Sequence, residues 1–156
     1  MGADVAPTLH LTNFSCIKLH GPGLVFTIMA RPRSWEHGVG RVPALVPGGL
    51  TLTLMDPALT ERVIGRIGPA TDAYRAAWMR DLESALQRGV LAPGAMLWSA
   101  EAGQPPTEAV GDGDTLCCAC SRAEATAGRC HRAWAAPFLV RAGWRVLLDG
   151  AEVESV

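Results

Sequence analysis

The residues of this sequence that could do chemistry gather in one short segment. Four of the five cysteines lie within fourteen residues, and the last of them is followed by a histidine and an arginine: Cys117, Cys118, Cys120, Cys130, His131 and Arg132. A thiol beside an imidazole and a guanidinium is a common way to assemble a cysteine nucleophile or a phosphate pocket. We therefore predict a site here, with Cys130, His131 and Cys118 as the catalytic candidates.

The surrounding pattern predicts a strand, a loop and a helix. A turn at Gly111–Asp114 precedes the apolar run 115–120, and an Ala- and Trp-rich segment begins after Cys130. Unpaired backbone N–H groups at a helix start attract anions and lower the pKa of a nearby thiol. On a strand Cys118 and Cys120 share one face, so we expect Cys117 on the other face, in the core. In an open α/β sheet the functional crevice lies beyond the carboxyl ends of the strands, which is where Cys120 would be.

The same residues admit two other interpretations. Cys118, Cys120, Cys130 and His131 could supply soft ligands to zinc, in a site with three protein ligands and an open fourth position. Alternatively, the cysteines pack as small hydrophobic residues, while His131 and Arg132 bond loop carbonyls. We expect no cofactor, and zinc is the one alternative that these residues offer.

A second candidate segment carries Arg31, Arg33 and Trp35, just after the apolar run 24–29. Proline and glycine prevent regular structure over most of the following twenty residues, and a long ordered loop is usually functional. The three side chains could hold an anionic or planar ligand, although a surface loop anchored by one buried Trp fits equally well. If the runs 24–29 and 115–120 are parallel strands, both segments leave the sheet at one edge. We then expect one pocket containing Arg31 or Arg33, Trp35, His131 and Arg132.

Several further elements must position these segments. Strands are predicted at 8–12, 24–29, 50–54, 95–98, 115–120 and 144–148, and helices near 56–65, at 71–89 and after 130. Alternating strands and helices predict a single α/β domain, residues 1–156, with a mostly parallel sheet of about five strands and helices on both faces. Residues 1–7 are expected to be a flexible N-terminus and residues 150–156 a tail.

The helix at 71–89 has the strongest pattern. Thr71 can cap its N-terminus, and Gly89 lies at the position after the last turn, where a glycine in the left-handed conformation commonly ends a helix. Its apolar residues recur every four positions and should face the sheet as core residues. They are Tyr74, Trp78, Leu82 and Leu86.

Composition limits the class of protein. The 156 residues are 49% hydrophobic and 19% charged, as expected for one soluble domain with its own core. Fourteen basic and fifteen acidic residues give a net charge of -1, so nucleic acid could bind only through a local patch. No apolar run approaches the ~20 residues of a membrane helix. We expect a cytoplasmic protein with reduced thiols. Its expected partner is a small anionic ligand. A second copy of the chain is an alternative partner, in a homodimer anchored by an exposed Trp35 or Trp144.

The sequence resembles the bacterial and phage domain-of-unknown-function 488 family, whose members carry a Leu-Leu-Cys strand and a Cys-His-Arg triplet. The resemblance is carried by the segment Leu116–Cys120, the short loop after it and the triplet Cys130-His131-Arg132. The resemblance extends to residues 11–14, 31–35, 43–47 and 74–75. It implies an α/β domain whose signature residues converge on one pocket, and it implies no established reaction.

Together these patterns predict a cytosolic enzyme that acts on a nucleotide-like or other phosphorylated small molecule. Cys130 or Cys118 would be the nucleophile and His131 the acid or base, while Arg31, Arg33 and Arg132 would hold the anion. A non-catalytic module that only recognises an anion or a partner is the first alternative. A zinc-binding domain is the second.

Overall fold

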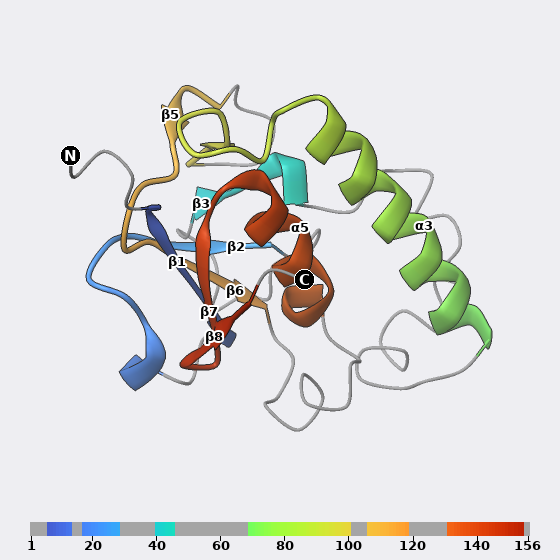
Figure 1. The fold of residues 1–156 in the computed structure, drawn as a ribbon, viewed down its shortest axis with the longest axis horizontal. Coiled ribbons are helices and arrows are strands. Elements are labelled where there is room, and N and C mark those ends of the chain that lie inside the picture. Colours follow the sequence, from blue (N-terminus) through green and yellow to red (C-terminus); the bar gives the residue numbers. More distant parts are fainter. Residues whose placement is uncertain are drawn as a thin grey trace.

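The computed structural model describes residues 6–13, 17–28, 40–45, 69–100, 106–118 and 131–154 (Figure 1). For residues 17, 69–74, 118 and 131 it describes the backbone alone. The predicted strand 50–54, the helix expected near 56–65 and the segment with Arg31, Arg33 and Trp35 lie outside these ranges.

A six-stranded sheet forms the centre of the fold, in the order β3-β2-β6-β1-β7-β8. The strands are β1 (Thr8–Asn13), β2 (Val25–Thr27), β3 (Gly40–Arg41), β6 (Thr115–Cys118), β7 (Arg145–Leu148) and β8 (Ala151–Val153). The first five are parallel to one another, and β8 runs antiparallel to β7. The predicted α/β fold with a mostly parallel sheet is confirmed, with six strands where about five were expected.

Strand β1 lies between β6 and β7 and is buried on both faces at its carboxyl half. Leu11 pairs with Leu116, and both are fully buried in the hydrophobic core. The next pair, Thr12 and Cys117, points to the opposite face and is also fully buried. A strand covered on both sides in this way is typical of parallel sheets.

Two α-helices lie in the described part of the chain, α3 (Pro69–Gln87) and α5 (His131–Ala142), together with two short 3-10 helices, η2 (Ile17–Leu19) and η4 (Pro43–Leu45). Helix α5 packs against β1, β6 and β7, whereas α3 packs chiefly against α5 and η4. The rings of Trp78 and Trp134 join the two helices at 5.9 Å. The apolar stripe of α3 therefore meets α5, which lies between α3 and the sheet (Figure 1), and our expectation that it faces the sheet is wrong. Helices on both faces are not confirmed.

The ends of α3 differ in how well they were predicted. Gly89 has φ +76°, the left-handed conformation expected after the last turn. The helix begins at Pro69, so Thr71 lies inside the first turn and is not the cap. Proline is well suited to a first turn because its missing N–H would have no partner there.

Short strands account for most of the other differences. Residues 95–98 were expected in the main sheet, but β4 (Leu97–Trp98) pairs with β5 (Glu108–Ala109) in a separate antiparallel sheet. A bridge between Arg41 and Ser99 connects this sheet to β3. No strand was predicted between residues 98 and 115, where β5 lies.

Described residues near both ends of the sequence pair with the main sheet. Residues 151–153, expected in a tail, form β8, which follows a two-residue turn at Asp149 and Gly150. At the other end the Pro7 carbonyl accepts the N–H of Arg145 at 2.9 Å. Trp144, considered above as an exposed dimer anchor, is buried and donates its Nε1–H to the Leu91 carbonyl at 2.7 Å. It therefore belongs to the core. Within the described ranges no helix has the length and apolar character needed to cross a membrane.

Candidate functional site

The carboxyl ends of the central strands meet the start of α5 at one edge of the sheet. Cys118, the last residue of β6, pairs with Asn13, the last residue of β1. Asp149 directly follows β7, and Arg132 is the second residue of α5. The structure thus brings the backbone positions of Cys118 and His131 to the edge where a parallel sheet offers its crevice.

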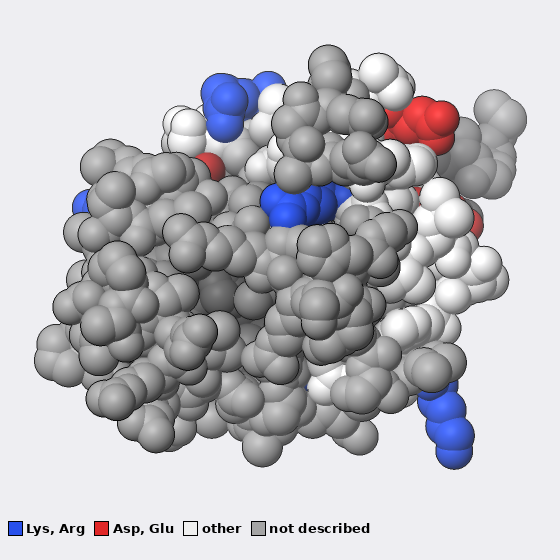
Figure 2. Space-filling model, turned by 180° about the vertical axis from the view of Figure 1, so that it is seen from behind, with Lys and Arg blue, Asp and Glu red and all other residues white. Residues whose placement is uncertain are grey.

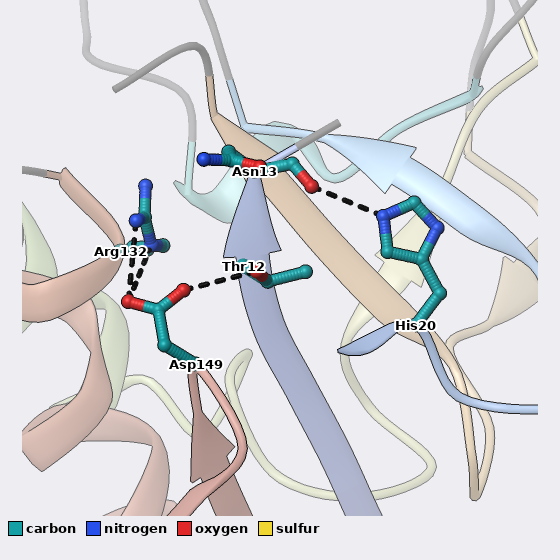
Figure 3. A network of polar contacts seen from close by, with 5 residues as sticks. All are labelled: Thr12, Asn13, His20, Arg132 and Asp149. Carbon is teal, nitrogen blue, oxygen red and sulfur yellow. Dashed lines mark hydrogen bonds and ion pairs between the residues drawn. The ribbon is translucent and has the colours of Figure 1, made fainter. Parts of the chain in front are cut away.

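Arg132 connects the start of α5 to this edge through a buried ion pair. Its side chain is 0% exposed, and its Nη2 and Nε atoms lie 3.2 and 3.3 Å from Oδ2 of Asp149. The second carboxylate oxygen of Asp149 accepts a hydrogen bond from the Thr12 hydroxyl at 2.9 Å (Figure 3). One carboxylate therefore links α5, the end of β7 and β1.

The local sequence explains why this carboxylate is so firmly placed. The Asp149 N–H donates to the Leu11 carbonyl at 2.8 Å, which continues the β1–β7 pairing by one residue. Asp149 and Gly150 then adopt φ values of +49° and +85°. Asp-Gly is a favoured pair for two-residue hairpin turns that need positive φ at both positions. The turn fixes the backbone of Asp149, and Thr12 fixes its side chain.

The chemistry of Arg132 differs in part from our expectation. We predicted a side chain that binds an external anion, and the structure gives it a carboxylate of the chain itself. Both nitrogens contact a single oxygen, so the pair lacks the two parallel bonds of the strongest Arg–carboxylate geometry. The role of Arg132 as a ligand of an external anion stays a prediction.

The face of the sheet to which Thr12 and Cys117 point carries a second group of polar side chains. Cys117 is buried, as predicted, and its Sγ lies 3.8 Å from Nε2 of His20. The same nitrogen lies 3.0 Å from the carbonyl oxygen of Asn13, which can only accept a hydrogen bond. Nε2 therefore carries the hydrogen in that contact and cannot also take the thiol proton. In this arrangement Cys117 and His20 do not form a nucleophile and its base.

His10 lies on the same face, beneath the chain at Gly21. Burial is the main cause that lowers the pKa of its imidazole, and the positive charge of Arg145 lowers it further. A Cβ on Gly21 would collide with the His10 ring. His10 is thus a neutral, tightly packed side chain at pH 7, remote from the start of α5 along β1.

The turn Gly111–Asp114, predicted from sequence, lies at the amino edge of the sheet. The carboxylate of Asp112 accepts the N–H of Thr8 at 2.7 Å. The buried carboxylate of Asp114 accepts the N–H groups of Leu24 and Gly111 at 2.9 and 2.7 Å. These acidic groups hold backbone in place at the edge opposite to Arg132.

Several candidate residues lie where the structure gives no side-chain geometry. Cys120, Cys130, Arg31, Arg33 and Trp35 are outside the described residues, as are the side chains of Cys118 and His131. The catalytic, anion-binding and zinc assignments of these residues therefore stay predictions. One premise of the shared pocket is confirmed, because β2 and β6 are parallel and both strands end at the same edge of the sheet.

Sequence reasoning missed three polar residues of this edge: Thr12, His20 and Asp149. Asp149 could have been found, because Asp-Gly between the apolar Leu147-Leu148 and the segment 151–153 is a hairpin signal. Thr12 can be identified as the partner of Asp149 only once the strand order is known. His20 gave no signal in the sequence.

The described charged groups on one face of the molecule can be followed in a space-filling view. On the face opposite to that of Figure 1, the Lys and Arg side chains of described residues stand apart from one another (Figure 2). The described residues on this face thus form no continuous basic patch of the kind that nucleic acid would need. Comparison with protein-family models, with curated proteins and with solved structures gives no match for this chain. The resemblance to the domain-of-unknown-function 488 family rests on the motif residues alone.

Proposed function

We propose that the protein is an enzyme that acts on a phosphorylated or similar anionic small molecule at the carboxyl edge of its sheet. In this proposal Cys118 or Cys130 is the nucleophile, and His131 is the acid or base. The observation that supports it most directly is the link from Arg132 through Asp149 to Thr12. This link fixes the start of α5, and with it His131, at the edge where β6 ends in Cys118.

The physical chemistry of this edge favours an anion and a reactive thiol. The first N–H groups of α5 have no partner within the helix, and its dipole adds positive potential at the same place. An anionic group can be held there, and a thiol nearby is stabilised as the thiolate that reacts. Arg31, Arg33 and Trp35 would complete the site, because β2, the strand that precedes them in the sequence, ends at the same edge.

The test is alkylation of the folded protein by iodoacetamide at pH 7, with each cysteine followed by mass spectrometry. A thiol of ordinary pKa is only about 3% ionised at pH 7, so a stabilised thiolate at Cys118 or Cys130 should react on the order of tenfold faster. Inorganic phosphate should slow that reaction. Buried Cys117 serves as the internal reference and should stay unmodified while the protein is folded.

The result that contradicts the proposal is equally direct. If Cys118 and Cys130 react no faster than a free thiol and phosphate does not protect them, there is no thiol enzyme at this edge. If phosphate binds while both thiols are unreactive, the protein is a binding module. Zinc is measured in the same sample, because a bound ion would also protect these thiols.

A further inference from the structure

We infer that Asp149 is a positioning residue of this site, which holds Arg132 in place and offsets its charge, so that it limits how tightly the start of α5 binds an anion. This role rests on the proposed function and extends it to residues outside the Cys-His-Arg triplet. An acidic side chain is unusual beside an anion-binding site, and this role would account for its presence.

The contacts of Asp149 leave its carboxylate little freedom to move away. Oδ1 is held by the Thr12 hydroxyl at 2.9 Å, Oδ2 by Arg132 at 3.2 Å, and the backbone N–H by Leu11 at 2.8 Å. The carboxylate is therefore a fixed negative charge at the beginning of α5. Any anion that binds the first turn of the helix is repelled by this charge and attracted by Arg132.

Burial makes both charges effective at this place. Arg132 is 0% exposed and Asp149 is 14% exposed, so water and salt screen them much less than a surface pair. The structure also offers a surface pair for comparison. Arg145 and Glu152, at 2.8 Å, are 50% and 53% exposed, and Arg145 starts β7 at the opposite edge of the sheet.

The two members of the buried pair should consequently have opposite effects on anion binding. Asp149→Asn leaves the Arg132 charge without its carboxylate, so the affinity for an anion should rise. Arg132→Gln leaves the carboxylate alone, so the affinity should fall. For charges within about one helical turn at intermediate dielectric, each change should be on the order of tenfold. A purely structural pair predicts a loss in both variants, because either change loosens the start of α5.

The experiment measures the Kd of inorganic phosphate for the full chain by calorimetry at low ionic strength. We expect about tenfold tighter binding by Asp149→Asn, about tenfold weaker binding by Arg132→Gln, and a Kd within about threefold of the original in the double variant. The matched controls are Glu152→Gln and Arg145→Gln, which remove the same charges from the exposed pair. They should change Kd less than about twofold.

Shifts of the same sign in the two single variants, or control variants that shift Kd as much, would overturn the role of Asp149. If one single variant does not fold, the double variant removes both charges of this pair, and its comparison with the remaining single variant still gives the sign. If the unmodified protein does not bind phosphate, the proposed function fails and this role falls with it. Phosphate binding combined with same-sign shifts contradicts the role of Asp149 alone.

Discussion

Removing either half of the buried ion pair should destabilise the fold, but by unequal amounts. Asp149→Asn keeps the shape of the side chain, and Asn tolerates the positive φ of this turn at least as well as Asp. It removes the Asp149 carboxylate from a fully buried guanidinium, and removing one partner of a buried ion pair typically costs about 3–5 kcal/mol. Because the amide oxygen can still accept a hydrogen bond from Arg132, we expect about 3 kcal/mol.

Arg132→Gln should cost less, because the group that remains is better solvated. The carboxylate of Asp149 is 14% exposed and keeps its hydrogen bond from Thr12. Water and the Thr12 hydroxyl together reduce the penalty to about 1–2 kcal/mol. In this background Thr12→Val should cost more than in the original protein, since the unpaired carboxylate then depends on that hydroxyl.

Urea unfolding followed by tryptophan fluorescence provides the assay, because Trp78, Trp134 and Trp144 are all buried reporters. The exposed pair is again the control, and Glu152→Gln should leave the unfolding midpoint almost unchanged. Equal losses in the two single variants would contradict this reasoning. A larger loss for Arg132→Gln would contradict it as well. Either result would mean that the guanidinium loses no more stability without its carboxylate partner than the carboxylate loses without the guanidinium.

Two further predictions concern the face of the sheet beneath Gly21. Gly21→Ala should lower the melting temperature by several degrees, because its Cβ would collide with the Gly113 carbonyl and the His10 ring. The control is Gly111→Ala, which should change the melting temperature little, because the atom nearest to the new Cβ is Asp114 Oδ2 at 3.7 Å. Equal effects of the two substitutions would show that the chain at Gly21 can shift. The pKa of His10 is lowered in the folded state, mainly by burial, so the unfolded chain binds the proton more readily and stability should be lost as the pH falls below about 6.5. Unfolding free energies measured from pH 8 to 5 should therefore decline less in His10→Asn than in the original protein, and parallel curves would contradict this assignment.

The central strands could be predicted from sequence because their physical signal is local. Runs such as 24–29 and 115–120 are apolar on nearly every position, which a strand buried on both faces requires. Gly89 was predicted for an equally local reason, since only glycine adopts φ +76° without a steric cost. Strands of two residues, such as β3 and β5, are too short to show any periodicity. Their existence depends on pairing with distant backbone.

The polar contacts of the site depend on tertiary arrangement and could not be predicted. The sequence shows that Arg132 stands near a helix start, but the choice of Asp149 as its partner follows from the turn after β7. Thr12 and Asp149 are 137 residues apart, and their contact requires β1 to lie beside β7. Trp144 illustrates the same point, because a tryptophan before a strand can be an exposed anchor or a core residue. The hydrogen bond from its Nε1 to the Leu91 carbonyl, which identifies it as a core residue, is seen only in the structure.

The position of β1 between β6 and β7 has a consequence for how the chain folds. Strand β1 finds its partners only in the last third of the sequence, since Leu11 pairs with Leu116 and Leu148. Native contacts of such long sequence separation raise the contact order, and the entropy of closing the intervening loops must be overcome before the contacts form. The centre of the sheet should accordingly assemble late and slowly. Until β6 and β7 are synthesised, β1 has both edges unpaired, so we expect its apolar residues to be a target for chaperones during synthesis.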